Sequence, residues 1–402
     1  MTVPVPVAAP RLRIALLTYS TKPRGGVVHT LALAEALADL GQDVEVWTLG
    51  RGGDAGFYRP VDPAVRVRLA PFEDRDGETV GARIVRSIAV LADALRADGL
   101  AADVVHAQDC LSANAALAVR PDVLRTVHHL DQFSTPELVA CHEKALREPA
   151  GHVCVSRSVA AELAAGWGIR ATVIPNGVAA QRFASAADPT DPRAAVRRAR
   201  WRRELGRYVL AVGGIEPRKG TADLVEAMAL LRARAPGVAL VLAGGDTLFD
   251  YRGYRDAVLA RAAELGVAPV LLGPVPHDEL PALMAAAAVF AFPSTKEGFG
   301  LAAMEALAAG VPVVLRDLPV LREVFGGAAR FANTPDALAD ALADALATDA
   351  PATDPSPTGP GRAGLARDAA MARAGRELAR RHTWAAAAEA HLRLYRGRRP
   401  SG

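Results

Sequence analysis

The chain reads FPSTKEGFGLAAMEALAAG from Phe292 to Gly310, and this stretch shapes how the rest of the sequence is interpreted. An apolar run at 288–292 precedes it and predicts a buried strand. The glycines at 298 and 300 predict a tight turn, and a helix is predicted from about 301 to 309, ended by Gly310. The stretch is therefore a strand, a glycine loop and a helix.

Two glutamates frame the loop and the helix. Glu297 lies where the strand opens into the loop, and Glu305 lies about one turn into the helix, roughly 8–12 Å away along the backbone. Free N–H groups in the first turn of a helix favour negative charge. A diphosphate can rest there, with a carboxylate on either side to accept hydrogen bonds from sugar hydroxyls. The alternative is an ordinary strand-loop-helix with one solvated glutamate and one on a helix face.

Length and composition exclude several classes of protein. A chain of 402 residues predicts two domains, and 51% apolar with 23% charged residues indicates a globular protein. A net charge of +3 argues against a nucleic-acid partner. The three cysteines, Cys110, Cys141 and Cys154, show no metal spacing and are predicted to be reduced thiols. The proline-containing start does not resemble a signal peptide, and no apolar run reaches the ~18 residues of a membrane span, so we expect a cytoplasmic protein.

The first half begins with a strand-helix-strand unit. Strands are predicted at 12–18 and 44–49, and a helix at 27–37 follows the glycines Gly25 and Gly26. The turn is not G-x-G-x-x-G, and no acidic residue closes the second strand. The sequence therefore argues against a nicotinamide dinucleotide site.

Polar side chains follow two further predicted strands. The strand at 103–109 carries His106 and Asp109, and the strand at 125–131 carries His128 and His129. Ligands bind outside the carboxyl ends of parallel strands, where these residues are expected. The spacing of His106, Asp109 and His128 matches no metal motif, so we predict no metal site.

The second half repeats the alternation of strands and helices. A strand at 207–214 leads to Arg218 and Lys219, cations beside a glycine turn that can clamp a diphosphate. Before it, residues 184–206 lose apolar periodicity and predict an interdomain linker. An aromatic-rich segment at 246–255 has no assigned role, and the Pro- and Gly-rich segment at 349–364 predicts a loop.

Glu297 and Glu305, with Gly-Phe-Gly-Leu between them, resemble the paired-glutamate signature of the retaining glycosyltransferases of family 4. The resemblance implies an α/β protein of GT-B fold, with two Rossmann-like parallel-sheet domains that face a cleft. The acceptor-side domain would span 1–183, completed by 384–402, and the donor-side domain would span 207–383.

The resemblance also implies roles for single residues. Glu305 would bind the nucleotide ribose, and Glu297 and His128 would contact the transferred sugar, with Glu297, His128 and Lys219 as the catalytic set. Family members have an arginine where this chain has Gly214, and Arg218 is hypothesised to supply the missing charge. The expected donor-binding set is Gly25, Gly26, Gly214, Arg218, Lys219, Val275, Glu297, Gly298, Phe299, Gly300, Leu301 and Glu305, and the expected acceptor-side set is His106, Asp109 and His129.

The implied activity is sugar transfer from a nucleotide-sugar, such as a UDP- or GDP-sugar, with retention and without metal or cofactor. A peripheral membrane contact is expected if the acceptor is a lipid. A pair of carboxylates around a phosphate-type loop suits binding better than the water activation of a glycoside hydrolase. The alternatives are an inactive nucleotide-sugar-binding relative, which Gly214 favours, and a nucleotide-sugar epimerase on the same fold.

Overall fold

The computed structural model describes residues 10–245, 251–347 and 361–398, which form two α/β units. The first unit contains the described residues of 1–155 and 159–177, together with those from Trp384 onward. The second contains 156–158 and the described residues of 178–383. Among these residues, no helix combines the length and the apolar character that crossing a membrane requires.

The first unit is built on a seven-stranded parallel sheet in the order β3-β2-β1-β4-β5-β6-β7. Its strands are β1 Arg13–Leu17, β2 Asp43–Arg51, β3 Val65–Phe72, β4 Val104–Ala107, β5 Leu124–Val127, β6 Gly151–Cys154 and β7 Thr172–Val173. Its helices are α1 Gly25–Asp39, α2 Val80–Asp98, α3 Cys110–Leu117, α4 Pro136–Arg147, α5 Arg157–Trp167 and α15 Trp384–Gly397.

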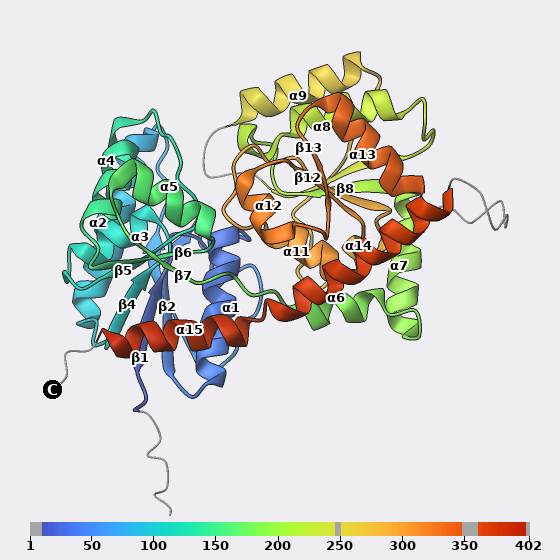
Figure 1. Cartoon of the computed structure of the whole chain (residues 1–402). Helices are drawn as coiled ribbons and strands as arrows, with labels where there is room; N and C mark the ends of the chain where they lie inside the picture. Colours follow the sequence, from blue (N-terminus) through green and yellow to red (C-terminus); the bar gives the residue numbers. More distant parts are fainter. Residues whose placement is uncertain (1–9, 246–250, 348–360, 399–402) are drawn as a thin grey trace, which may run out of the picture. The chain divides into compact units, whose positions relative to one another are not determined.

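The central strands of this sheet are apolar along most of their length because helices cover both faces. In β1, all residues after Arg13 are buried. The last helix, α15, packs against α1 (Figure 1) and contributes Ala388, Leu392 and Tyr395 to the same core as Leu31. The C-terminal helix is therefore part of the first unit.

The second unit has a six-stranded parallel sheet in the order β10-β9-β8-β11-β12-β13. Its strands are β8 Tyr208–Val212, β9 Ala239–Ala243, β10 Val270–Gly273, β11 Val289–Phe292, β12 Val313–Arg316 and β13 Arg330–Ala332. Its helices are α6 Ala180–Ala187, α7 Pro192–Leu205, the short 3₁₀ helix η1 Pro217–Lys219, α8 Thr221–Leu231, α9 Arg252–Glu264, α10 Leu280–Ala286, α11 Leu301–Ala308, α12 Pro319–Phe325, α13 Pro335–Ala347 and α14 Gly361–Arg381.

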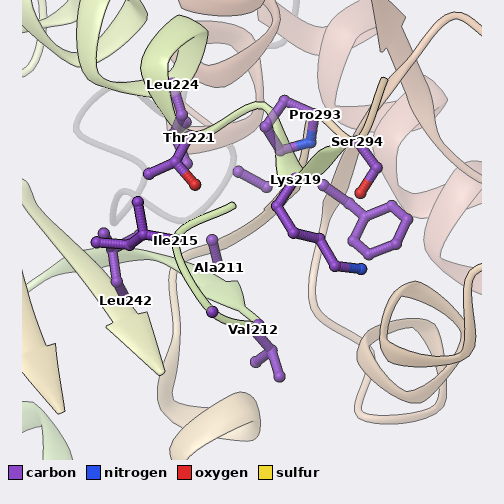
Figure 2. A pocket seen from close by; sticks show the side chains of 13 residues that line it. Ala211, Val212, Ile215, Lys219, Thr221, Leu224, Leu242, Pro293 and Ser294 are labelled. Carbon is purple, nitrogen blue, oxygen red and sulfur yellow. The ribbon is translucent and has the colours of Figure 1, made fainter. Parts of the chain in front are cut away.

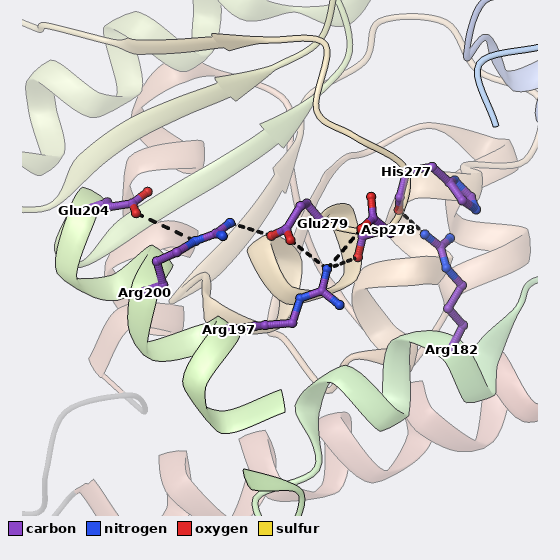
Figure 3. A network of polar contacts seen from close by, with 7 residues as sticks. All are labelled: Arg182, Arg197, Arg200, Glu204, His277, Asp278 and Glu279. Carbon is purple, nitrogen blue, oxygen red and sulfur yellow. Dashed lines mark hydrogen bonds and ion pairs between the residues drawn. The ribbon is translucent and has the colours of Figure 1, made fainter. Parts of the chain in front are cut away.

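The predicted linker at 184–206 is wrong, because helices α6 and α7 occupy most of it and belong to the second unit. Helix α7 packs on α10, and Figure 3 shows its polar contacts with Asp278 and Glu279, which lead into α10. Arg197 and Arg200 both reach the carboxylate of Glu279, with N–O distances of 2.7 and 2.5 Å. Ion pairs replace much of the apolar contact that a docked helix usually makes. The sequence therefore lacks the apolar periodicity by which such a helix is recognised.

Two of the segments interpreted from sequence lie partly outside the described residues. Residues 246–250 of the aromatic-rich segment are not described, and α9 begins soon after, at Arg252. Most of the predicted loop at 349–364 is likewise outside the described part of the chain, and α14 begins at Gly361.

In each sheet the strand order reverses at one point, and such switch points are where open α/β sheets bind ligands. The reversal lies between β1 and β4 in the first sheet and between β8 and β11 in the second. The loops that leave β8 and β11 carry Lys219 and Glu297. The fold thus places the residues predicted from sequence at a switch point.

We expect Gly244→Ala to destabilise the second unit by about 1–3 kcal/mol, the usual cost of overpacking. A Cβ at Gly244 would collide with the carbonyl group of Gly213, and this neighbour is backbone that cannot rotate away. Gly253→Ala is the matched control, since a Cβ there meets open space. Gly253 lies in helix α9, where replacing glycine by alanine stabilises the folded state by up to about 1 kcal/mol. Urea unfolding of both variants measures the difference. Equal stability of the two variants would contradict the prediction.

Candidate functional site

The loops after β8 and β11 are held together by backbone contacts. The N–H of Thr295 donates a hydrogen bond to the carbonyl oxygen of Arg218, at 2.8 Å. Gly220 has a φ of +66°, and a Cβ there would collide with the carbonyl of Pro293. The guanidinium of Arg316 donates to the same Pro293 carbonyl at 3.0 and 3.1 Å. This packing fixes Arg218 and Lys219 relative to the loop that carries Glu297.

Two cations meet one carboxylate at this junction. Atom Oε2 of Glu297 lies 3.5 Å from Nζ of Lys219 and 3.5 Å from Nη1 of Arg218. Arg218 also pairs with Glu216, at 2.9 Å. Arg218 therefore points into the site that the sequence assigns to it. Gly214 lines the adjacent cavity, to which it contributes backbone alone.

A cavity of about 20 Å³ lies beside Lys219, at the carboxyl ends of β8 and β11. In Figure 2 the ammonium of Lys219 and the hydroxyl of Ser294 lie on the same side of it. Nζ of Lys219 lies 5.1 Å from the centre of the Phe292 ring. Burial lowers the pKa of Lys219, and the nearby Glu297 opposes that shift. The cavity holds about one water molecule, so it can take only a small part of a larger ligand.

No side chain caps the N-terminus of α11. Its N-cap is Gly300, with a φ of +94°. A Cβ at Gly300 would approach the Phe325 ring to 2.9 Å, so the loop needs glycine both for its conformation and for space. Uncapped N–H groups and the helix dipole favour a phosphate or carboxylate at this place. Phe299 is buried just before it and anchors the turn.

Glu305 lies further along α11 and is half-buried. Burial raises the pKa of its carboxyl group to about 7, and the charge of Arg182 on α6 opposes the shift. Arg182 donates a hydrogen bond to the carbonyl oxygen of His277 (Figure 3). Val275, predicted as a nucleobase contact, is a half-buried residue of the same loop after β10. Glu305 is thus a carboxyl group whose protonation changes near neutral pH.

In the first unit, the first turn of α1 lies beside the residue that follows β5. A Cβ at Gly26 would lie 3.6 Å from Cδ2 and Nε2 of His128, and the rings of His128 and His29 are 4.9 Å apart. Burial lowers the pKa of His128 to about 3, so its imidazole is neutral. Among the described residues, Nε2 of His128 has no hydrogen-bond partner. Gly26 and His128 are therefore neighbours, and one buried ring nitrogen of His128 makes no hydrogen bond within the described residues.

The predicted acceptor-side residues do not form one group. His106 is completely buried, with Nδ1 2.7 Å from the Tyr395 hydroxyl and Nε2 2.9 Å from the Thr126 hydroxyl. Both ring nitrogens are thus occupied, so the acceptor role predicted for His106 is corrected to a packing role. Asp109 caps α3 by accepting from the N–H of Ser112 at 2.8 Å. His129 pairs with Asp131 at 2.9 Å.

The sequence did not single out Ser294 or Arg182. Ser294 is buried and lines the cavity, and its hydroxyl has no hydrogen-bond partner in the part of the chain that the structure describes. Its position directly after a predicted strand was a usable signal, because side chains at the carboxyl end of a strand face the ligand edge. Arg182 gave no such signal, since it lies on a helix far from Glu305 in the sequence.

Two family models match the chain. Residues 195–359 match "Glycosyl transferases group 1", and residues 23–182 match "Glycosyltransferase Family 4". The D-inositol 3-phosphate glycosyltransferase of Mycolicibacterium vanbaalenii is 32% identical over 389 residues, which cover 85% of this chain and 84% of that protein. The O-antigen chain mannosyltransferase B of Escherichia coli is 40% identical over 151 residues, covering 35% of this chain and 37% of that protein.

Solved structures share the fold. Sucrose-phosphate synthase from Thermosynechococcus elongatus superposes with a TM-score of 0.73 and 22% identity, covering 96% of this chain and 99% of that chain. HepE from Anabaena, in complex with UDP-glucose, gives a TM-score of 0.70 and 18% identity, covering 96% of this chain and 100% of that chain. At such identities the likeness establishes the fold alone. It confirms the predicted GT-B class, with its two Rossmann-like parallel-sheet domains.

Proposed function

Because the chain belongs to the glycosyl transferases group 1 family, we propose that it transfers a sugar from a nucleotide-sugar to an acceptor hydroxyl, with retention of anomeric configuration and without a metal. The donor is a UDP- or GDP-sugar in this proposal. HepE, a structural relative, is described in complex with UDP-glucose, which supports a uridine nucleotide as the first to test.

One observation carries the proposal more than any other. Lys219 and Arg218 both face the carboxylate of Glu297 at the switch point of the second sheet, beside a helix N-terminus that no side chain caps. Fixed cations and uncapped N–H groups match the diphosphate of a nucleotide-sugar. The adjacent carboxylate matches the hydroxyls of the sugar that the diphosphate carries.

In the proposed reaction the oxygen of the acceptor hydroxyl bonds to the anomeric carbon of the sugar, and the bond from that carbon to the diphosphate breaks. Negative charge grows on the leaving diphosphate, which takes up the proton that the hydroxyl loses. Lys219 and Arg218 stabilise that charge, as pre-positioned cations do in a partly buried site. Glu297 accepts hydrogen bonds from the sugar, and Glu305 accepts them from the ribose. In the first unit, the neutral imidazole of His128 provides a ring nitrogen for a sugar hydroxyl. The side-chain cations take the place of a divalent metal.

The direct test is calorimetry of the full chain with a panel of nucleoside diphosphates and nucleotide-sugars, with and without a chelator. We expect one nucleotide to bind selectively, with the same affinity when the chelator is present. Release of nucleoside diphosphate in the presence of a candidate acceptor then demonstrates transfer. Loss of binding on chelation would contradict the metal-free proposal.

A nucleotide-sugar-binding protein without transferase activity is the second candidate, and Gly214 in place of the family's arginine favours it. The same titration separates the two candidates when it is combined with a turnover assay. A donor that binds, and yet releases no nucleoside diphosphate with any acceptor, would favour the binding protein.

We expect Glu305→Gln to weaken donor binding and to stabilise the unliganded protein at alkaline pH. Losing a charged hydrogen-bond acceptor weakens binding by about 10- to 100-fold, equivalent to about 1.5–3 kcal/mol. The pKa of Glu305 is raised to about 7. The folded state therefore binds more protons than the unfolded state between about pH 4.5 and 7, and stability falls as pH rises through that range. Glutamine removes this penalty at pH 8 and changes little at pH 4.

Calorimetry and urea unfolding at pH 8 and pH 4 measure the two effects. Glu264→Gln, on the exposed face of α9, is the matched control and is expected to change neither. Unchanged donor affinity in Glu305→Gln would remove Glu305 from the donor site.

A further inference from the structure

Two of the three cysteines lie together, and none of the roles above uses them. Cys110 is the first residue of α3, and Cys141 lies on α4, which packs beside α3 in the first unit (Figure 1). All three cysteines are free thiols, and the side chains of Cys110 and Cys141 are hydrogen-bonded to each other. We refer to these two residues as the thiol pair.

The side chain of Asn114 ties the two helices together at the thiol pair. Its Nδ2 donates to the carbonyl oxygens of Cys110 and Cys141, both at 2.8 Å, and lies 3.4 Å from Sγ of Cys141. Asn114 is buried, so water does not compete for these hydrogen bonds. The packing of α3 on α4 therefore holds the two cysteines in contact.

A buried cation lies near the thiol pair. Arg125 on β5 is 4% exposed, and its Nε and Nη1 have no hydrogen-bond partner among the described residues. Burial lowers the pKa of Arg125, and the charges of Cys110 and Asp109 are the main opposing causes. A guanidinium stays charged in proteins, so a buried one needs a negative neighbour. The thiolate form of Cys110 supplies such a charge.

Cys110 is the member of the pair that ionises more easily. The thiol of Cys141 and the imidazole of His142 both hydrogen-bond to it, and it lies at the start of α3, where a helix favours negative charge. The hydrogen bond from Cys141 lowers the pKa of Cys110 below its usual value, although burial opposes this shift. The third cysteine, Cys154, is completely buried in β6, and burial raises its pKa to about 12.

We propose that the thiol pair is a site of reversible oxidation, in which a peroxide oxidises Cys110 and Cys141 then forms a disulfide bond with it. The inference concerns α3 and α4 alone and does not depend on the proposed transferase reaction. Cys110 is 8% exposed and Cys141 is 4% exposed, so the site admits a small oxidant such as hydrogen peroxide.

The oxidation has two steps. The thiolate sulfur of Cys110 attacks one oxygen of hydrogen peroxide, the O–O bond breaks, and the hydroxide that leaves takes up a solvent proton to become water. The sulfur of Cys141 then attacks the sulfur of the Cys110 sulfenic acid, and the S–O bond breaks. The hydroxide that leaves takes up the thiol proton of Cys141. The two thiols together lose two electrons, and peroxide is reduced to two molecules of water.

The first test counts thiols and maps the bond in the reduced full chain after hydrogen peroxide is added at pH 7. We expect two of the three thiols to disappear together, and peptide mass spectrometry to find Cys110 joined to Cys141 with Cys154 free. Dithiothreitol restores both thiols. If the folded protein kept all three thiols under peroxide that oxidises the urea-unfolded chain, the proposal would be overturned. A disulfide that includes Cys154 or joins two chains would also overturn it.

The second test separates the roles of the two sulfur atoms. In Cys141→Ser, whose hydroxyl keeps a hydrogen-bond donor, we expect oxidation to stop at the Cys110 sulfenic acid, which dimedone labels. In Cys110→Ser, we expect the remaining thiol of the pair to react at least about tenfold more slowly than Cys110 does. Cys154→Ala is the matched control and forms the disulfide at the wild-type rate. Dimedone labelling of Cys141 in Cys110→Ser, as fast as that of Cys110 in Cys141→Ser, would contradict the assignment of the thiolate.

The third test removes the buried cation. We expect Arg125→Met to slow the oxidation of Cys110 by about tenfold, because its thiolate loses the nearby positive charge. An apolar side chain of similar length suits a buried position, and urea unfolding verifies that the variant is folded. An unchanged rate in the folded variant would overturn the pairing of Arg125 with Cys110 on which the proposal rests.

Discussion

Lys219→Met is expected to lower kcat by about 10²- to 10³-fold, the usual effect of removing one fixed charge-stabilising group from an active site. Nζ of Lys219 lies 3.5 Å from Glu297 and lines the cavity at the switch point of the second sheet. Methionine keeps much of the side-chain volume and removes the charge. Because the charge matters most as the diphosphate leaves, the loss is expected mainly in kcat, with a smaller change in donor affinity. Steady-state kinetics with a saturating acceptor measures both.

Arg218→Met tests whether Arg218 supplies the charge that Gly214 lacks. We expect it to lower kcat as well, because Arg218 and Lys219 are equally close to the same carboxylate oxygen. Lys144→Met, on the exposed part of α4, is the matched control and should behave as the wild type. If Arg218→Met matched this control, Arg218 would be a structural partner of Glu216 only.

The first unit is expected to lose stability steeply below about pH 6. His29, His106, His128 and His391 are buried together, with ring centres 4.9 to 6.2 Å apart along the cluster. Burial lowers the pKa of each, to about 3 for His128 and about 4 for His391. Their neutral forms persist in the folded protein, whereas the unfolded chain takes up protons below about pH 6.5.

The size of this effect follows from proton linkage. Each histidine lowers the free energy of unfolding by about 1.4 kcal/mol for each pH unit below pH 6.5, until the pH reaches the pKa of that histidine in the folded state. Asp109, with its pKa raised to about 7, acts in the opposite direction and offsets about one of the four. The net loss from these four histidines and Asp109, about 4 kcal/mol per pH unit, compares with a typical total stability of about 5–15 kcal/mol. We therefore expect acid unfolding of this unit near pH 5.

Urea unfolding between pH 7.5 and pH 5, followed by tryptophan fluorescence, measures this slope. Trp384 packs against His29, with ring centres 5.4 Å apart, and reports on the cluster. His391→Leu is expected to reduce the slope of unfolding free energy against pH by about one quarter to one third. The reason is that the unfolded variant takes up one proton fewer than the unfolded wild type. Leu392→Ala, its buried neighbour, should lower stability at every pH and leave the slope unchanged. A slope unaffected by His391→Leu would contradict the assignment.

The sequence by itself determined the features that depend on local physical rules. Continuous apolar runs fixed most of the strands, and the glycine turn before Leu301 fixed a helix start that lacks a side-chain cap. Lys219 follows β8 and Glu297 follows β11. The two residues were therefore expected at the same edge of the sheet, because the carboxyl ends of parallel strands lie along one edge. Each of these inferences needs only neighbouring residues and the direction of the strands.

The tertiary structure decided what depends on contact between segments that are distant in the sequence. It brought Arg218 to Glu297, buried His106 between Tyr395 and Thr126, and gathered Arg24 and Arg51 around Tyr19. It also docked α7 through ion pairs, where the sequence suggested a linker. Burial and charge pairing depend on how helices and strands pack. The sequence alone does not show whether a histidine or arginine faces a ligand or the core. That is why the strand, glycine loop and helix at 288–310 were predictable from sequence, and why the contacts of the individual polar side chains around them were not.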